Sequence, residues 1–175
     1  MLKVRQGLRY RDTVGILLVL DGQLLIVSNT PDKPYWDVPQ GGVEQGETDI
    51  DAFFRESRQE LGKSWLSYIG KPIPVGERPR TYLKPFVRGG EKFNAKLYRY
   101  YVAELRGLPS MAAEWITSPC RGPAPTNQFN RIALACYDHA LSLMKTRAEY
   151  EPAAACKVDI LQEMVGRLYA ARIIQ

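Results

Sequence analysis

Two acidic residues near the middle of the chain have the spacing expected of ligands for a divalent metal ion. Glu56 and Glu60 are four positions apart in a segment with helical features, so both side chains are expected on one helix face. Carboxylates this close repel each other unless a cation lies between them, and Mg²⁺ and Mn²⁺ prefer such hard oxygen ligands. An ion held there neutralises a diphosphate and activates a water for attack at phosphorus. The ordinary alternative is a solvated acidic helix face, where most acids lie.

A pattern of glycines, acids and one arginine surrounds this pair in residues 41–63, GGVEQGETDIDAFFRESRQELGK. Its fixed positions are Gly41, Glu47, Arg55, Glu56, Glu60 and Gly62. This spacing resembles the signature of the Nudix hydrolase family, G-x5-E-x7-R-E-U-x-E-E-x-G-U, in which U is an aliphatic residue. The resemblance implies an α+β fold, a Nudix-type α/β/α sandwich with a mixed central sheet. It also implies a hydrolase that cleaves a nucleoside diphosphate linkage with Mg²⁺ or Mn²⁺.

The resemblance gives an expected role to each group of matched residues. The expected catalytic residues are Glu56, Glu60, Arg55 and Glu47. The expected metal ligands are Glu56, Glu60 and Gln59. Expected substrate contacts come from the loop before the helix and from a downstream ring: Gln40, Gly41, Gly42 and Phe129. From the residues alone, Arg55 is expected to lie against Glu47 or against loop carbonyls and to hold the carboxylates in place.

Three positions depart from the signature. Gln59 stands where the family has a metal-binding glutamate. A glutamine oxygen can still coordinate a cation, but it supplies no negative charge. Ser57 and Lys63 replace aliphatic residues, and we expect the fold to tolerate both changes. The change at Gln59 therefore bears on metal affinity and catalytic rate more than on the fold.

Segments outside the signature resemble one branch of the family, the RNA 5′-pyrophosphohydrolases and dinucleoside polyphosphate hydrolases. Trp36–Val43 is similar to the W-x-x-P-Q-G-G segment of that branch. Weaker matches follow at Lys96–Val102, Glu114–Trp115 and Pro125–Arg131. The resemblance implies that the substrate is a nucleotide or an RNA 5′ end.

Two further departures lie in the downstream region. Met111 stands where the branch has a catalytic glutamate, and Glu114 of this chain is a nearby candidate to replace it. Asn130 stands where the branch has a lysine. Phe129 is predicted either to stack on a nucleobase, a contact of about 1–3 kcal/mol, or to pack at the start of a helix. These departures motivate an alternative function, a catalytically weakened Nudix domain that binds nucleotide or RNA or helps to assemble a complex.

Apolar periodicity and turn signals predict the elements that position these residues. Thr13–Leu20 and Gln23–Ser28 are apolar runs, and the Asp21-Gly22 pair between them predicts a β-hairpin. A loop is expected over Asn29–Pro39, which is rich in proline and aspartate.

The helix that carries the signature is expected to begin after Thr48, a suitable N-cap, and to run to Leu61 before Gly62. Asp49 and Asp51 suit its first turn, because acids interact favourably with a helix N-terminus. The predicted inner stripe consists of Ile50, Phe53, Phe54, Ser57 and Leu61.

The remaining predicted elements follow in chain order. Trp65–Ile69 is predicted to be a strand, Lys71–Arg80 a connection, and Lys96–Leu105 a strand with Tyr98, Tyr100 and Val102 on one face. A short strand at Trp115–Thr117 and helices at Asn127–Lys145 and Lys157–Ile174 complete the set. We predict a Nudix domain over residues 1–145 and a C-terminal helical extension, 146–175, packed on it. That extension is a candidate surface for a homodimer or a larger complex.

Composition and charge fit a globular protein that meets a polyanion. The 175-residue chain has a net charge of +5, which favours the approach of a nucleotide or RNA. A solvated surface that is merely basic explains this charge equally well. Cys120, Cys136 and Cys156 match neither a disulfide framework nor a zinc site, so we expect free thiols in a reducing compartment, the cytoplasm or an organellar matrix. No apolar run approaches the roughly 18 residues that cross a bilayer, so no membrane partner is expected.

Overall fold

A computed structural model describes residues 3–5, 7–28, 36–110, 112, 131–150 and 155–174 of the chain. The strands are β1 (Lys3–Arg5), β2 (Leu8–Leu20), β3 (Gln23–Ser28), β4 (Gln40–Gly42), β5 (Ile73–Arg88), β6 (Glu91–Glu104) and β7 (Arg131–Ala135). The helices are α1 (Asp49–Glu60), the short 3₁₀ helix η1 (Lys63–Trp65), α3 (Tyr137–Tyr150) and α4 (Ala155–Ala170).

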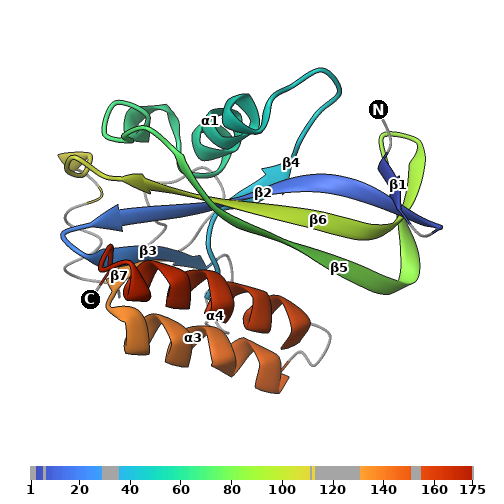
Figure 1. Ribbon diagram of the computed structural model, residues 1–175. Coiled ribbons are helices and arrows are strands. Elements are labelled where there is room, and N and C mark those ends of the chain that lie inside the picture. The colour runs from blue at the N-terminus through green and yellow to red at the C-terminus, as the bar shows by residue number, and fades with distance from the viewer. Residues whose placement is uncertain are drawn as a thin grey trace.

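A mixed sheet forms the middle layer of the molecule. Its strands lie in the order β5-β6-β2-β3-β7, and the short strands β1 and β4 also pair with β2. β2 and β6 run parallel, whereas the other pairs are antiparallel. Helix α1 covers one face of the sheet, and α3 and α4 cover the other (Figure 1). The expected α/β/α sandwich with a mixed sheet is therefore confirmed.

Two apolar cores lie on opposite faces of the sheet, because successive strand residues point to opposite sides. In β2, Ile16 and Leu18 join the core under α1, whereas Leu17 and Val19 join the core under α3 and α4. The second core includes Met164 and other side chains of α4. The C-terminal helices thus pack on the same sheet as α1, and the predicted domain boundary at residue 145 would fall inside α3.

Helix α1 begins and ends as its capping residues predict. Thr48 accepts a hydrogen bond from the Asp51 N–H, and the Asp51 carboxylate accepts one from the Thr48 N–H, which makes a capping box. In the predicted inner stripe, Phe53 and Leu61 are buried, but Ile50 is 37% exposed, so its placement in the stripe was wrong. The reason lies next to it, because the neighbouring first-turn residue Asp49 is directed at polar side chains of β6 rather than at an apolar core.

Two predictions downstream of α1 were wrong. The predicted strand Trp65–Ile69 is instead a 3₁₀ helix followed by turns, and of these residues only Ile69 makes a β-bridge, to Leu105. The predicted connection Lys71–Arg80 is largely strand β5. Its prolines are tolerated because β5 ends the sheet order, and an edge strand needs no backbone N–H on its outer side.

The predicted helix Asn127–Lys145 also proved wrong at its first half. Residues 131–135 form strand β7, which pairs antiparallel with β3, and the helix begins only at Tyr137. A five-residue apolar run has no periodicity that separates strand from helix, so pairing with β3 decides it. The last predicted helix, Lys157–Ile174, is confirmed as α4 over most of its length.

Several predicted features remain predictions. The strand at Trp115–Thr117, Met111, and the segment with Phe129 and Asn130 lie outside the described residues. Of the cysteines, Cys136 is an exposed free thiol, as expected.

Candidate active site

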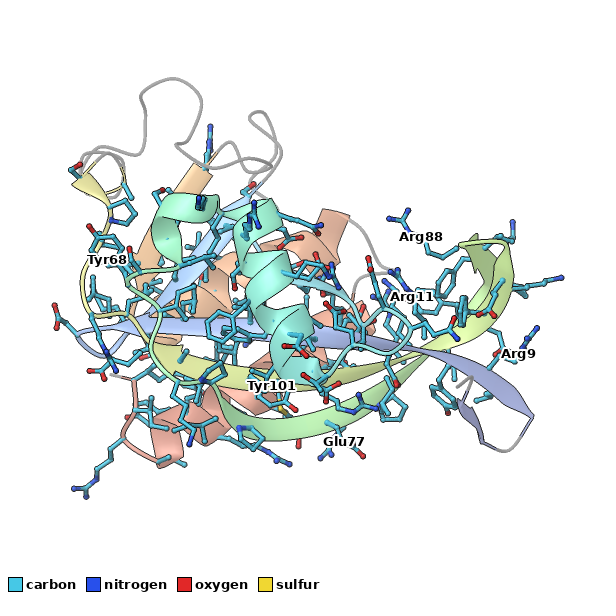
Figure 2. All side chains as sticks on the ribbon, turned by 90° about the horizontal axis from the view of Figure 1, so that it is seen from above. Arg9, Arg11, Tyr68, Glu77, Arg88 and Tyr101 are labelled. Atoms are coloured by element: carbon cyan, nitrogen blue, oxygen red, sulfur yellow. The ribbon has the colours of Figure 1, made fainter. Side chains whose placement is uncertain are left out.

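A cavity of about 1080 Å³ opens where β4 and the C-terminal half of α1 meet β2 and the β5–β6 hairpin. One side of it is acidic and the other is basic. The acidic side is lined by Glu47, Glu56 and Glu60, and the basic side by Arg11, Arg88 and Lys96. Figure 2 views the molecule from the α1 side. It shows Arg11 and Arg88 near each other and away from the N-terminal end of α1, where Tyr101 lies.

Arg55 organises the acidic side. Its Nε and Nη2 donate hydrogen bonds of 2.7 and 2.8 Å to the two carboxylate oxygens of Glu47, and Nη2 also donates to the Gly42 carbonyl at 2.7 Å. Its Nη1 donates to Glu56 at 2.6 Å. Such a fork suits a guanidinium, because its donors lie in one plane. The sequence left open whether Arg55 lies against Glu47 or against loop carbonyls, and the structure shows both contacts. Its hydrogen bond to Glu56 shows how it positions that carboxylate.

These contacts shift the pKa values of the pair. The hydrogen bond from Arg55 lowers the pKa of Glu47, although partial burial opposes the shift. The hydrogen bond to Glu47 in turn raises the pKa of Arg55. Glu47 therefore stays ionised and Arg55 charged across the working pH range, and the tie between loop and helix is permanent.

Gly41 makes room for the Glu56 carboxylate. A Cβ atom placed on Gly41 would lie 1.7 Å from the Glu56 carboxyl carbon. Gly41 has no positive φ; the glycine with one in this loop is Gly46, at 81°. At Gly41 the requirement is thus space for the carboxylate, which lies directly on the β4 backbone.

Glu60 is the buried member of the acidic pair. Only 9% of the residue is exposed, and its Oε2 accepts a 2.8 Å hydrogen bond from the Gln40 N–H. Its pKa is raised to about 8, chiefly by burial and also by the negative charges of Glu56 and Asp37, against the lowering effects of the Gln40 N–H and Lys157. A carboxylate held dry beside a second carboxylate is a group that a cation would stabilise.

The donor set fits Mg²⁺ or Mn²⁺. Among the described residues, no three His, Cys, Asp or Glu side chains form a group able to hold a metal by themselves. Mg²⁺ does not require one, because it usually binds through one or two carboxylates and completes its shell with waters and substrate phosphates. Glu56 and Glu60 are two such carboxylates facing one cavity.

Gln59 lies beside this pair. Its side chain is exposed at the cavity and its Oε1 accepts a 3.2 Å hydrogen bond from Arg55 Nη1. The amide oxygen therefore shares the guanidinium with Glu47 and Glu56. Its role as a metal ligand remains a prediction.

A second arginine, absent from the sequence-based predictions, ties the start of α1 to the sheet. Arg99 of β6 forms ion pairs of 2.7 Å with Asp49 and 3.1 Å with Asp12, and it lies 3.6 Å from Glu77. Tyr101 donates a 2.9 Å hydrogen bond to the other oxygen of Asp49. The alternation of Arg99 and Tyr101 in the sequence indicates that both side chains lie on the same face of a strand. Only the parallel pairing of β2 with β6 shows that this face lies under α1.

Lys157 of α4 also escaped sequence reasoning. Its ammonium pairs with Asp37, three residues before Gln40, and only 4% of the Lys157 side chain is exposed. Asp37 in turn accepts a 2.8 Å hydrogen bond from the Val38 N–H. The C-terminal helix thus holds the segment that leads into β4 and the cavity, a contact between residues 120 positions apart that no local pattern indicates.

Comparison with known proteins identifies the fold and the signature together. The NUDIX domain matches residues 9–117. The chain belongs to this family. Helix α1 with the β4 loop is therefore the Nudix segment of the chain. Five of the six matched signature positions line its cavity: Gly41, Glu47, Arg55, Glu56 and Glu60.

Several relatives of the chain are named RNA pyrophosphohydrolase. An RNA pyrophosphohydrolase of Ruthia magnifica subsp. Calyptogena magnifica is 39% identical over 95 residues, 42% of this chain and 53% of the relative. One from Legionella pneumophila (strain Corby) is 28% identical over 109 residues, 50% of this chain and 62% of the relative. One from Hydrogenovibrio crunogenus is 29% identical over 158 residues, 78% of this chain and 89% of the relative. The alignments thus cover less than two thirds of the first two relatives.

Solved structures share the fold. A NUDIX hydrolase from Nitrosomonas europaea superposes with a TM-score of 0.55 at 16% identity, over 95% of this chain and 96% of that one. A C. elegans Ap4A hydrolase superposes with a TM-score of 0.52 at 13% identity, over 91% and 96%. Among the described residues, no helix is long and apolar enough to cross a membrane.

Proposed function

We propose that the protein is a metal-dependent pyrophosphohydrolase that acts on nucleoside diphosphate linkages, with the 5′-triphosphate end of RNA as its substrate. The observation that carries the proposal is the pairing, in one cavity, of the buried Glu60 with Glu56 on the acidic side and a row of cations on the opposite side. Acids suit a divalent cation, and the cations suit the phosphates of the substrate.

The proposed roles follow from the contacts. Glu56 and Glu60 would hold the cation, with Gln59 as a neutral third donor. Bound there, Mg²⁺ or Mn²⁺ neutralises phosphate charge and makes a coordinated water more acidic. Arg55 and Glu47 act as positioning residues, because their hydrogen bonds fix the Glu56 carboxylate and the β4 loop.

The loop before the helix is the proposed substrate-binding edge. The Gln40 side-chain Oε1 is buried with no hydrogen-bond partner, and Gln40 lines the cavity. A buried carbonyl oxygen without a partner is costly, so a donor on a bound ligand or its water shell would stabilise it. Gly41 and Gly42 let the Glu56 carboxylate and the Arg11 guanidinium lie against the β4 backbone, where both can meet the ion and the phosphates. Phe129, from the part of the chain outside the description, keeps its predicted role as a base-stacking residue.

Hydrolysis is favoured over a purely binding role. The relatives are named as pyrophosphohydrolases, and the acids that match the signature are held in place by Arg55 and Gln40 rather than turned away. A binding module would need none of these carboxylates to be ordered around a cavity.

The test is a substrate panel with a matched inactive variant. The protein is incubated with 5′-triphosphorylated RNA, capped RNA or a dinucleoside tetraphosphate in Mg²⁺ or Mn²⁺, and phosphate and pyrophosphate release is measured. We expect turnover on triphosphorylated RNA and a loss of at least about a hundredfold in Glu60→Gln, since even residues behind a metal ligand contribute about 10–100-fold. Unfolding curves establish that the variant is folded. Wild-type protein without turnover on any substrate, or Glu60→Gln with full turnover, would refute the proposal.

A further inference from the structure

The outer part of the β5–β6 hairpin, counted from Arg78, which pairs with Glu163 of α4, holds the excess positive charge of the protein. Residues 78–96 contain six lysines and arginines and a single acid, Glu91, so this segment carries a formal charge equal to the +5 of the whole chain. The rest of the chain is neutral overall. Positive charge gathered on one face is the electrostatic mark of a surface that binds a polyanion.

The hairpin reaches beyond the helices. In Figure 1 its turn end curls beside β1, at the side of the molecule away from α1 and from the C-terminal end of the chain. The strand register shifts between Thr81 and Phe86, an irregularity of the kind that bends a strand. Gly89 and Gly90 form the turn with φ of 57° and 78°. The bend carries the end of the hairpin toward the rim of the cavity, where Arg88 and Gly89 are part of the lining.

Aromatic rings hold Lys96 at the inner end of this surface. Its Nζ lies 5.6 Å from the centre of the Phe86 ring and 5.9 Å from that of Tyr98, and Phe86 stacks on Phe93 at 5.7 Å. Burial, together with the charges of Arg11 and other nearby cations, lowers the Lys96 pKa to about 8. An ammonium kept among rings and other cations gains more than an exposed one when an anion arrives.

Other cations of the described region make ion pairs with acids, among them Arg55, Arg78, Arg99, Lys157 and Arg167. On the hairpin, Glu91 lies opposite Arg88 in the strand register and also lines the cavity. Arg11 instead lies against the Gly42 backbone. Burial lowers the pKa of Arg11, and the nearby charge of Arg88 is the second cause of this shift. Arg11, Arg88 and Lys96 therefore present a line of charge that begins at the acidic side of the cavity and continues onto the hairpin.

The cavity extends from the acidic residues of α1 to the hairpin. Its volume of about 1080 Å³ lies at the upper end of the sizes usual for small-molecule sites, about 300–1,000 Å³, and its lining reaches the exposed Arg88. A dinucleoside polyphosphate would occupy the acidic side and leave the hairpin charge unused.

We propose that Arg88, Lys92 and Lys96, here called the hairpin cations, bind the backbone phosphates of the RNA strand that continues from the 5′ polyphosphate. This inference rests on the proposed function, because it assumes that the polyphosphate end lies between Glu56 and Arg11. It makes the substrate class an RNA end with several nucleotides, with the hairpin reading chain length and not base sequence, since phosphate contacts carry no sequence information.

The test compares a hairpin variant with a variant that removes the same charge elsewhere. Arg88→Ala/Lys92→Ala removes two exposed cations of the hairpin, and Lys71→Ala/Arg106→Ala removes two exposed cations outside it. Binding of a twelve-nucleotide RNA with a 5′-monophosphate and a 3′-fluorophore is followed by anisotropy over a range of salt concentrations, in EDTA. Turnover is measured separately on triphosphorylated RNAs of two and twelve nucleotides.

We expect the hairpin variant to bind the twelve-nucleotide RNA roughly tenfold more weakly, with the salt slope reduced by about 0.7 for each lost contact. Its kcat/KM should fall several times more on the long RNA than on the dinucleotide, while the control variant behaves as wild type on both. Equal losses on both lengths, no loss on either, or an equal loss in the control variant would overturn the inference. If the wild type hydrolyses nothing, the proposed function fails, while the binding arm still tests the hairpin cations. Wild type that binds anionic lipid vesicles and not the RNA would overturn the inference in favour of a membrane surface.

Discussion

The two sides of the cavity are built on different principles. On the acidic side, each carboxylate has a fixed partner: Glu47 and Glu56 accept from Arg55, and Glu60 accepts from the Gln40 N–H. On the basic side, Arg11 and Lys96 lie against a backbone and aromatic rings rather than against acids. The acidic side is rigid before any ligand arrives, whereas the basic side is completed by the ligand.

This difference matches the demands of the proposed reaction. Chemistry at phosphorus needs donors held to within a fraction of an ångström, which a network around Arg55 provides. Binding a long, flexible polyanion needs charge density and tolerates variation in geometry. Substitutions on the acidic side should therefore alter turnover on every substrate, and those on the basic side should alter only the response to chain length, salt and pH.

The largest predicted effect comes from Lys157, whose ion pair with Asp37 ties α4 to the segment before β4 and so supports the cavity. Lys157→Met leaves the mostly buried Asp37 without its cation, and removal of one partner of a buried pair costs about 3–5 kcal/mol. The measurement is the free energy of unfolding in urea. The double variant Lys157→Met/Asp37→Asn removes both charges and keeps an acceptor for the Val38 N–H, so it should regain most of the loss. Equal stability of the single and double variants would show that the pair is not the cause.

Gly41→Ala should break the acidic side without unfolding the protein. The added Cβ would collide with the Glu56 carboxylate, which must then move from its place on Arg55. We expect kcat to fall by about 10–100-fold, as when the support of a metal ligand is removed. Gly46→Ala is the matched control, because nothing lies within 4 Å of its Cβ but its φ is 81°. That variant should lose about 1–2 kcal/mol of stability and keep its kcat. The reverse pattern would remove Gly41 from the mechanism.

The acidic side could be predicted from the sequence because its distances are local. Glu56, Glu60 and Arg55 lie within two helical turns, and Glu47 is only eight residues before Arg55, so a regular helix with one cap nearly determines their relation. The hairpin of β2 and β3 was equally local, and its Asp21-Gly22 turn was correctly placed.

The contacts missed by the sequence are those that depend on register between distant segments. Arg99 reaches Asp12 and Asp49 only because β6 runs parallel to β2, and Lys157 reaches Asp37 across most of the chain. The same cause explains why the strands β5 and β7 were not predicted. The prolines of β5 and the short length of β7 give no clear strand pattern, and each strand is stabilised by pairing with a distant neighbour. A strand is defined by a partner that lies elsewhere in the sequence, whereas a helix carries its partners within itself.

Gln59→Glu should sharpen the acidic side by restoring a charge. A third carboxylate beside Glu56 and Glu60 strengthens the attraction for a divalent ion, and we expect Mn²⁺ to bind about tenfold more tightly, in line with the 10–100-fold scale for groups around a metal. Calorimetric titration with Mn²⁺ measures this directly. The conservative control is Gln59→Asn, which shortens the amide and should weaken binding slightly. An unchanged affinity in Gln59→Glu would mean that Arg55 neutralises the new charge, and that position 59 serves the guanidinium rather than the metal.

The smallest predicted effect is the pH dependence of RNA affinity, which belongs to the basic side alone. Lys96 faces Arg11 of β2, Arg80 and Arg88 of β5, and Lys157 of α4, and its pKa is lowered to about 8. Below that pH it is charged and binds phosphate, so as pH rises from 7 to 9 its contact is lost and affinity for the twelve-nucleotide RNA should fall about fivefold, the value of one phosphate contact.

The arginines among these groups stay charged over this range, so they do not contribute to the change. Glu60 also titrates near pH 8, and its ionisation weakens RNA binding in the same direction. Lys96→Met separates the two, because it removes the part of the pH dependence that Lys96 causes and leaves the part due to Glu60. If Lys96→Met and wild type lose the same affinity between pH 7 and 9, Lys96 does not contact the RNA. Arg88 and Lys92 would then remain as the proposed phosphate-binding residues of the hairpin.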